Sequence, residues 1–244
     1  SEVQDAYLEM LYDVNVDKEQ AAYGVPYATN ASGVLYNEDL FAQAGVEVPK
    51  TWSEFQDVIT KLEDAGITPF EFTFADSWTC LPPWNSMAPV IPAADFTDQR
   101  KEGKTTFVGT HEEILEKYLS LLDHAQDDFM GTTYTDGNAA FANGSAAMMI
   151  NGNWAISEFL NTNPDMNVNM FAFPSVDDES KNTVTSGVDV LFAVSNQGSE
   201  EQQEAAKEFI RYALTKDVAQ EYIDDQFAFS AVNGVEQQNE TVSG

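Results

Sequence analysis

The residues best placed to bind a ligand lie in the stretch AAFANGSAAMMINGNWAISEFL, residues 139–160. A buried apolar run is followed by Asn-Gly-Asn, which we expect to form a rim, and then by Trp154. Loops at strand ends often carry functional residues, and Gly152, which has no Cβ, permits close backbone approach. A tryptophan offers a large apolar face and one N–H donor. The pattern predicts that Trp154 faces a ligand; the alternative is a core tryptophan packed with Ile156 and Phe159.

Residue types that support metal or nucleophilic chemistry are scarce. The chain has one cysteine, Cys80, and therefore no internal disulfide. Its two histidines, His111 and His124, are too few for a histidine-based metal site. The segment HEEIL at 111–115 lacks the second histidine of the HExxH zinc motif. We therefore expect no metal and no other cofactor.

Charge excludes several classes of partner. The chain of 244 residues has 11 Lys and Arg against 41 Asp and Glu, a formal net charge of −30. Such a field repels nucleic acid and anionic membrane surfaces, although it is compatible with neutral or cationic ligands. No run approaches the ~20 apolar residues of a membrane helix. The N-terminal residues have none of the features of a signal peptide, so we expect any targeting signal to lie outside this sequence.

The elements that position Trp154 follow from caps and apolar spacing. Capping-box sequences, each followed by apolar residues at helical spacing, predict helices after Thr51, Thr110 and Ser199. Apolar or aromatic runs predict strands at 68–74, 146–150, 168–173 and 187–194. Strands that alternate with helices favour an α/β fold with largely parallel pairing. Polar stretches at 30–33 and 181–187 indicate crossings between two lobes.

Three segments, in order, resemble one family. Residues 23–55 resemble the Tyr-Gly-x-Pro…Leu-Tyr-Asn-x-Asp-Leu…Pro-x-Thr-Trp-x-Glu-Phe signature of extracellular solute-binding proteins of ABC importers. The resemblance is to the sugar-binding group that includes maltose-binding protein (family 1). AAFANGSAAMMINGNW is similar to that family's A-x-F-x-x-Gly-x-Ala-Ala-Met-x-x-x-Gly-x-Trp pattern. SGVDVLFAVSNQGSEEQQEAAKEFIRYALT is similar to its strand-then-helix stretch ending in Phe-Ile-x-Tyr-x-Leu-Thr.

The resemblance implies a two-lobed, periplasmic-binding-protein-like (type II) α/β architecture. The implied domains are a remnant of the N-terminal lobe at 1–30, the C-terminal-lobe α/β domain at 31–186, and a return to the N-terminal lobe at 187–244. One lobe would then be nearly complete and the other partial. The first strand–helix units and the C-terminal helices of the family would lie outside this sequence.

The resemblance also implies a carbohydrate ligand. A sugar ring has apolar C–H faces and a rim of hydroxyls, so it needs aromatic platforms and polar side chains around the edge. Trp154 matches the family's sugar-stacking tryptophan, and Trp78, next to Asp76, falls where the family presents another aromatic residue. For the polar rim we expect Asn30 at the first lobe crossing and Asp189 at the second.

Each candidate also has a structural interpretation. Trp78 could instead pack its own loop, and Asn30 and Asp189 could be solvated loop residues. Two further residues are interpreted as structural. Trp52 lies in the first turn of a capped helix, and Asn37 is predicted to be the N-cap of the helix that follows it.

The implied function is ligand capture without chemistry. The chain would be the substrate-binding component of an ABC transporter, closing two lobes on a mono- or oligosaccharide that a membrane permease then receives. We expect a monomer outside the cytoplasm, in the periplasm or lipid-anchored at the outer face of the cell membrane, and no enzymatic activity. Three alternatives remain open: a binding protein for another small polar or cationic solute, a carbohydrate-active enzyme with paired carboxylates, and a structural lobe with an unused cleft.

Overall fold

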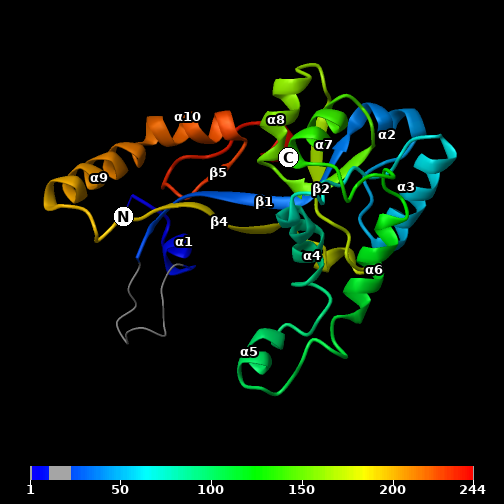
Figure 1. Ribbon diagram of the computed structural model, residues 1–244, viewed down its shortest axis with the longest axis horizontal. Coiled ribbons are helices and arrows are strands. Elements are labelled where there is room, and N and C mark those ends of the chain that lie inside the picture. The colour runs from blue at the N-terminus through cyan, green and yellow to red at the C-terminus, as the bar shows by residue number, and fades with distance from the viewer. Residues whose placement is uncertain (1, 11–22, 244) are drawn as a thin grey trace. The chain divides into compact units, whose positions relative to one another are not determined.

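The computed structural model describes residues 2–10 and 23–243 of the chain (Figure 1). They form two compact units: unit 1 is Ser1–Ala31 with Ser186–Gly244, and unit 2 is Ser32–Thr185. Of the N-terminal remnant predicted at 1–30, residues 1 and 11–22 lie outside the described residues.

The sheet of unit 2 is antiparallel where its strands pair in register. The C-terminal half of β1 (Val25–Asn37) pairs with β2 (Met148–Gly152) and β3 (Val168–Phe171), and Figure 1 shows β2 beside β1. Val34 lies opposite Ile150 on one strand and Phe171 on the other. The prediction of largely parallel pairing is therefore wrong for these strands.

The two strands predicted at 146–150 and 168–173 are present, whereas 68–74 is not a regular strand. Phe70 instead makes isolated parallel bridges to Ala125 and Met148. The polar stretch at 30–33, predicted as a crossing between lobes, is part of β1, where Ser32 lies opposite Gly152, and the division between unit 1 and unit 2 falls within it.

Helices cover this sheet. Those of unit 2 are α2 (Glu38–Ala44), α3 (Trp52–Asp64), α4 (Leu81–Met87), α5 (Phe96–Lys101), α6 (Glu112–Leu122), α7 (Tyr134–Ala142) and α8 (Ala155–Thr162), with 3-10 turns η1 (Ser77–Cys80) and η2 (Glu179–Lys181). As predicted, Asn37 caps α2, its Oδ1 accepting from the amide of Leu40 at 3.0 Å.

The capping box predicted at the start of α3 is confirmed, and the one at Thr110 is wrong. The Thr51 hydroxyl accepts from the amide of Glu54, whose carboxylate accepts from the amide of Thr51, each at 3.2 Å. At α6 the helix begins at Glu112 without a side-chain cap. The Thr110 hydroxyl donates to carbonyl groups of the preceding turn, and Glu112 accepts from the amide of Gly109.

An aromatic core holds unit 2 together. Phe55 of α3 meets Phe70 and Phe173 edge-to-face, at centroid distances of 5.8 and 5.4 Å. Burial of each such ring contributes roughly 1.5–3 kcal/mol. Trp52 packs on Phe55 and Phe173, and Lys117 Nζ lies 4.8 Å from its ring centroid, so Trp52 has the structural role predicted for it.

Unit 1 is built on the N-terminal half of β1. This half pairs with β4 (Thr185–Phe192) and, antiparallel, with β5 (Phe229–Ser230). Its helices are α1 (Asp5–Met10), α9 (Glu200–Ala213), α10 (Lys216–Gln226) and α11 (Glu240–Ser243). The capping box predicted at Ser199 is present at the start of α9. Tyr27, Ala219, Ile223 and Val232 belong to its small core.

Candidate functional site

Trp154 lies where β2 gives way to α8. The indole folds back on Gly152: a Cβ at that position would lie 2.0 to 2.4 Å from three of its ring atoms. Carbon atoms in favourable contact are about 3.5–4.0 Å apart, so any side chain at this position displaces the ring. Ile156 and Phe159 are fully buried, whereas Trp154 is half-buried. Because Gly152 has no side chain, the indole of Trp154 can lie outside the core.

A second tryptophan and a tyrosine lie next to Trp154. Trp78 in η1 is 42% exposed, and its ring centroid is 6.4 Å from that of Trp154, with an interplanar angle of 50°. Tyr134, the first residue of α7, packs on Trp78 at 4.9 Å. Asp76 fixes this arrangement, because its Oδ2 accepts from the backbone N–H of Tyr134 at 2.7 Å. The structure therefore brings Trp154, Trp78, Gly152 and Asp76 together. We call the three rings of Trp154, Trp78 and Tyr134 the aromatic cluster.

Polar groups lie at the edge of the aromatic cluster. Burial raises the pKa of the Tyr134 hydroxyl to about 12, so the group stays protonated at neutral pH. This hydroxyl lies beside Asn138 and Trp154 but makes no well-formed hydrogen bond, and neither does Asn138 Oδ1. Asn138 Nδ2 donates to Glu158 Oε2 at 2.8 Å. Tyr134 is not predicted by the sequence, because its only signal is an ordinary position after the cap residue Thr133.

The asparagines flanking Gly152 do not form the rim that the sequence predicts. Asn151 and Asn153 are 2% and 1% exposed. Asn151 Oδ1 accepts from the amide of Gly152 at 3.0 Å. A buried amide must find partners within the protein, so these side chains hold the loop in place.

The two polar residues predicted for the rim meet in unit 1. Asn30 on β1 donates through Nδ2 to Asp189 Oδ1 on β4, at 3.2 Å. Burial, together with the charge of Asp189, raises the pKa of Tyr222. Since a carboxylate can accept about four hydrogen bonds, Asp189 keeps free acceptor capacity for hydroxyl groups.

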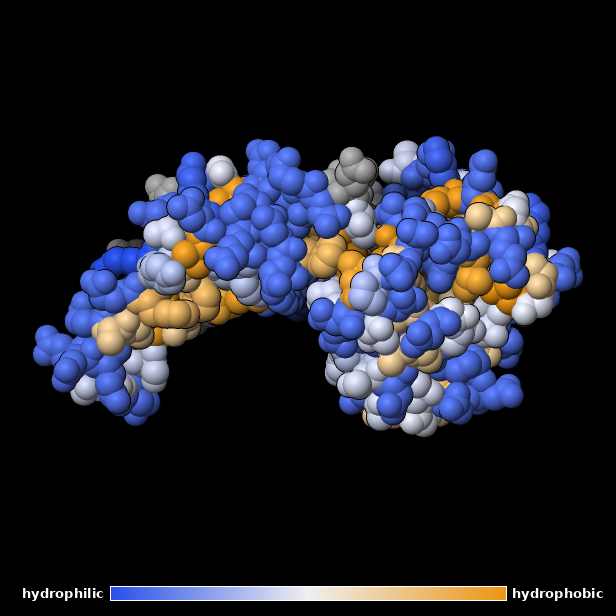
Figure 2. Space-filling view, turned by 90° about the horizontal axis from the view of Figure 1, so that it is seen from above, coloured by the Kyte–Doolittle hydropathy of each residue, from blue (hydrophilic) through white to orange (hydrophobic). Residues whose placement is uncertain are grey.

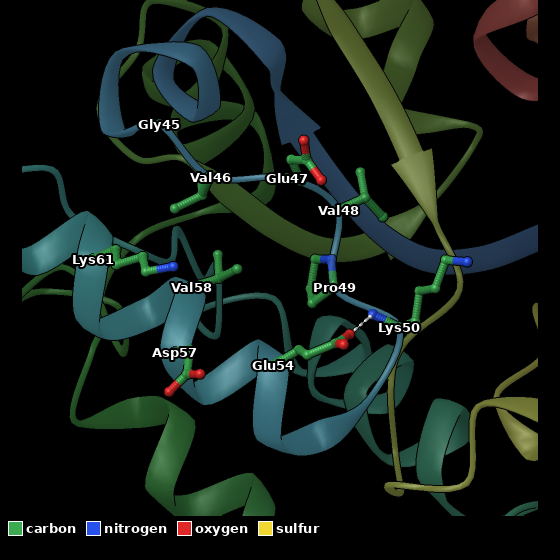
Figure 3. A pocket seen from close by; sticks show the side chains of 10 residues that line it. All are labelled: Gly45, Val46, Glu47, Val48, Pro49, Lys50, Glu54, Asp57, Val58 and Lys61. Atoms are coloured by element: carbon green, nitrogen blue, oxygen red, sulfur yellow. Dashed lines mark hydrogen bonds between the residues drawn. The ribbon is translucent and has the colours of Figure 1, made fainter.

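A groove elsewhere in unit 2 has different chemistry. Its volume is about 440 Å³, and it lies between the loop after α2 and the helix α3 (Figure 3). Glu54 on its wall already accepts from the amides of Lys50 and Thr51, and Lys50 Nζ pairs with Glu179 at 3.1 Å. The groove contains none of the predicted residues, and two of its charged side chains, Lys50 and Glu54, are already engaged. We therefore assign no ligand to it.

Comparison with known proteins identifies the family. Residues 4–243 match the family described as bacterial extracellular solute-binding protein. This chain belongs to that family. Among relatives, the multiple sugar-binding protein of Streptococcus mutans is 29% identical over 233 residues, which cover 92% of this chain and 54% of that protein. The chain spans about half the length of the curated relatives it matches.

Solved structures of solute-binding proteins share the fold. The solute-binding protein RafE in complex with raffinose has a TM-score of 0.83 at 26% identity, covering 98% of this chain and 62% of that one. A chitin oligosaccharide binding protein has a TM-score of 0.82 at 26% identity, covering 92% and 58%. The expected α/β fold of periplasmic solute-binding proteins is thus confirmed, and the family's extracellular location agrees with the one expected from the sequence.

Metal-binding clusters and membrane-spanning helices are absent from the part of the chain that the structure describes. Within residues 2–10 and 23–243, no group of three or more His, Cys, Asp or Glu side chains is placed to hold a metal ion. Among the helices that the structure describes, none combines the length and apolarity needed to cross a membrane. The relatives are named for solute binding rather than for catalysis.

Proposed function

We propose that this chain is the substrate-binding component of an ABC transporter and takes up a mono- or oligosaccharide on the aromatic cluster. The proposal rests on the indoles of Trp154 and Trp78, whose ring centroids are 6.4 Å apart. Gly152 leaves room for the first ring, and Asp76 anchors the loop that carries the second. The family supports it, since a similar protein is described with bound raffinose and another as binding chitin oligosaccharides.

The chemistry of the cluster suits a sugar. The apolar C–H faces of a pyranose stack on the indoles, and the Trp N–H and the protonated Tyr134 hydroxyl serve the ring hydroxyls. Within unit 1, Asn30 and Asp189 are proposed as ligand-binding residues in their own right, with acceptor capacity left on the Asp189 carboxylate. Nothing reacts: ligand binding stabilises the closed form of the protein, which a membrane permease receives outside the cytoplasm. The protein acts as a monomer, either free in the periplasm or anchored by a lipid.

A cationic solute is the second candidate, because paired aromatic rings attract cations and the net charge of −30 would draw them in. An enzyme is disfavoured at this cluster. Two carboxylates beside it are engaged, Asp76 by the Tyr134 amide and Glu158 by Asn138, instead of standing free as a pair across a cavity.

A thermal-shift screen of the full-length gene product separates these functions. A ligand that binds only the native state raises the melting temperature, by an amount that grows with its concentration. We expect raffinose or another oligosaccharide to raise it and spermidine to have no effect. Trp154→Ala should remove the shift, while Trp84→Phe, which alters a tryptophan stacked on His111 instead, should keep it. A rise in melting temperature with spermidine alone would indicate a cationic ligand instead of a sugar. Shortened sugar products would indicate an enzyme.

A further inference from the structure

One hydrogen bond lies a single helical turn away from two rings of the aromatic cluster. Asn138 follows Tyr134 by four positions on α7. Glu158 on α8 follows Trp154 by four positions, and Trp154 itself has helical backbone angles, φ −59° and ψ −22°. Residues i and i+4 share one face of a helix. Because Asn138 Nδ2 donates to Glu158 Oε2 at 2.8 Å, this bond joins the two helix faces that carry the rings.

Two other contacts also join α7 to α8. Phe141 and Phe159 are fully buried and pack with their ring centroids 4.9 Å apart. At the far end of the helices, Asn163 Nδ2 donates to the carbonyl oxygen of Ala142 at 2.8 Å. Apolar packing is non-directional, whereas a hydrogen bond requires a particular distance and direction. The bond one turn from the rings therefore supplies a directional contact at the end of the helices where the ligand is proposed to bind.

The chemistry of the pair fixes its orientation. Hydrophilic residues cover much of the face shown in Figure 2, so an exposed glutamate such as Glu158 is ordinary in a chain with 41 acidic residues. Its partner differs, because the Asn138 side chain belongs to a residue that is only 2% exposed. An ionised carboxylate accepts hydrogen bonds and donates none, so the amide must turn its Nδ2 toward Glu158. Glu158 thereby holds the amide in one orientation beside the Tyr134 hydroxyl.

We infer that Asn138 is a positioning residue for the ligand site: held by Glu158, it keeps α7 and α8 in the relative position at which Tyr134 and Trp154 present one binding surface. The inference rests on the proposed function for the nature of the ligand. Asn138 is too deeply buried to touch a ligand and acts through Tyr134. The alternative is a buried amide that stabilises the fold and has no effect on binding.

Raffinose affinity and urea denaturation, measured on variants of the full-length gene product, separate the two roles. Asn138→Leu replaces the amide by an apolar side chain of similar size and leaves the exposed Glu158 in contact with water. Asn163→Ala is the matched control, because it removes the hydrogen bond at the far end of the same two helices. We expect Asn138→Leu to raise the Kd about tenfold. The control should keep the Kd within about twofold, whatever its stability.

A conservative variant should rescue binding. Glu158→Gln retains a side-chain oxygen that can accept from Asn138 Nδ2, so its Kd should stay within about twofold of that of the unaltered protein. Glu158→Ala leaves the buried amide without this partner. Its Kd should rise about as much as that of Asn138→Leu.

A measurement without sugar tests the position of the rings themselves. Near-ultraviolet circular dichroism reports on fixed tertiary packing, and the part of the spectrum that Trp154→Phe removes depends on how this ring lies against Trp78. We expect Asn138→Leu to change that part and Asn163→Ala to preserve it. Equal spectra or equal raffinose affinities for these two variants would overturn the inference, as would Glu158→Gln binding as weakly as Glu158→Ala. If the unaltered protein binds neither raffinose nor another sugar, the proposed function fails, while the spectra still decide this inference.

Discussion

Replacing Gly152 by alanine should displace the Trp154 ring while leaving the fold intact. The backbone at this position is not in the left-handed region, so alanine is compatible with the strand. The new Cβ would lie 2.0 Å from the nearest atom of the indole. To restore a contact of about 3.5 Å, the ring has to move by roughly 1.5 Å.

The size of the effect follows from that displacement. Forcing an extra methyl group into a packed site costs about 1–3 kcal/mol. Since Trp154 is half-buried, its ring can move outward. We therefore expect the methyl group to weaken ligand binding and not to destabilise the fold. The Kd for the sugar then rises roughly 5- to 150-fold. The free energy of unfolding without ligand should change by less than about 1 kcal/mol, helped by the lower backbone entropy of alanine in the unfolded chain.

The assay is calorimetric titration with raffinose, paired with urea denaturation of the ligand-free protein. Gly131→Ala is the control, because a Cβ there meets only the Asp128 carbonyl oxygen, at 3.6 Å. The reasoning is refuted if Gly152→Ala binds sugar as tightly as Gly131→Ala. It is also refuted if the variant loses affinity only in proportion to a global loss of stability.

Two further predictions concern unit 2. Burial, opposed by a hydrogen bond from Ser145, raises the pKa of Glu71 above its ordinary 4.5. The folded protein therefore holds this proton more tightly than the unfolded chain. The stabilisation is complete below pH 4.5 and is lost as the pH rises through the raised pKa. Glu71→Gln should flatten that decline in urea denaturation, and an unchanged slope would contradict it. Thr51→Ala should cost about 1 kcal/mol by removing the cap of α3. Thr60→Ala, on the same helix, should cost less in the same measurement, and equal effects would count against the cap.

Local signals predicted the helix starts well. The boxes at Thr51 and Ser199 and the cap at Asn37 each depend on side chains within four residues of the amide they serve, so the sequence contains the whole interaction. The strands of 146–150 and 168–173 were found for a similar reason, because their apolar runs are short and bounded by turn residues. The capping box predicted at Thr110 is absent where a competing local hydrogen bond, donated by the amide of Gly109 to the Glu112 carboxylate, is available.

The pairing of strands that lie far apart in the chain could not be predicted from the sequence alone. The antiparallel register of β1 with β2 joins residues more than a hundred positions apart, and the polar residues 30–33 gave no strand signal. Tyr134 is held in the aromatic cluster by contacts with residues far away in the chain: Asp76 accepts from its amide, and Trp78 packs on its ring. The exposed side of α9 could not be anticipated either, since spacing shows which face is apolar but not what covers it.

The central claim is that Trp154 is a stacking surface for a sugar, and calorimetric titration of raffinose into the full-length gene product tests it most directly. Compared with the unaltered protein and with Trp84→Phe, Trp154→Ala should weaken binding by on the order of 2 kcal/mol, about 30-fold in Kd, because the largest platform is lost. Equal Kd values for Trp154→Ala and Trp84→Phe would contradict the account.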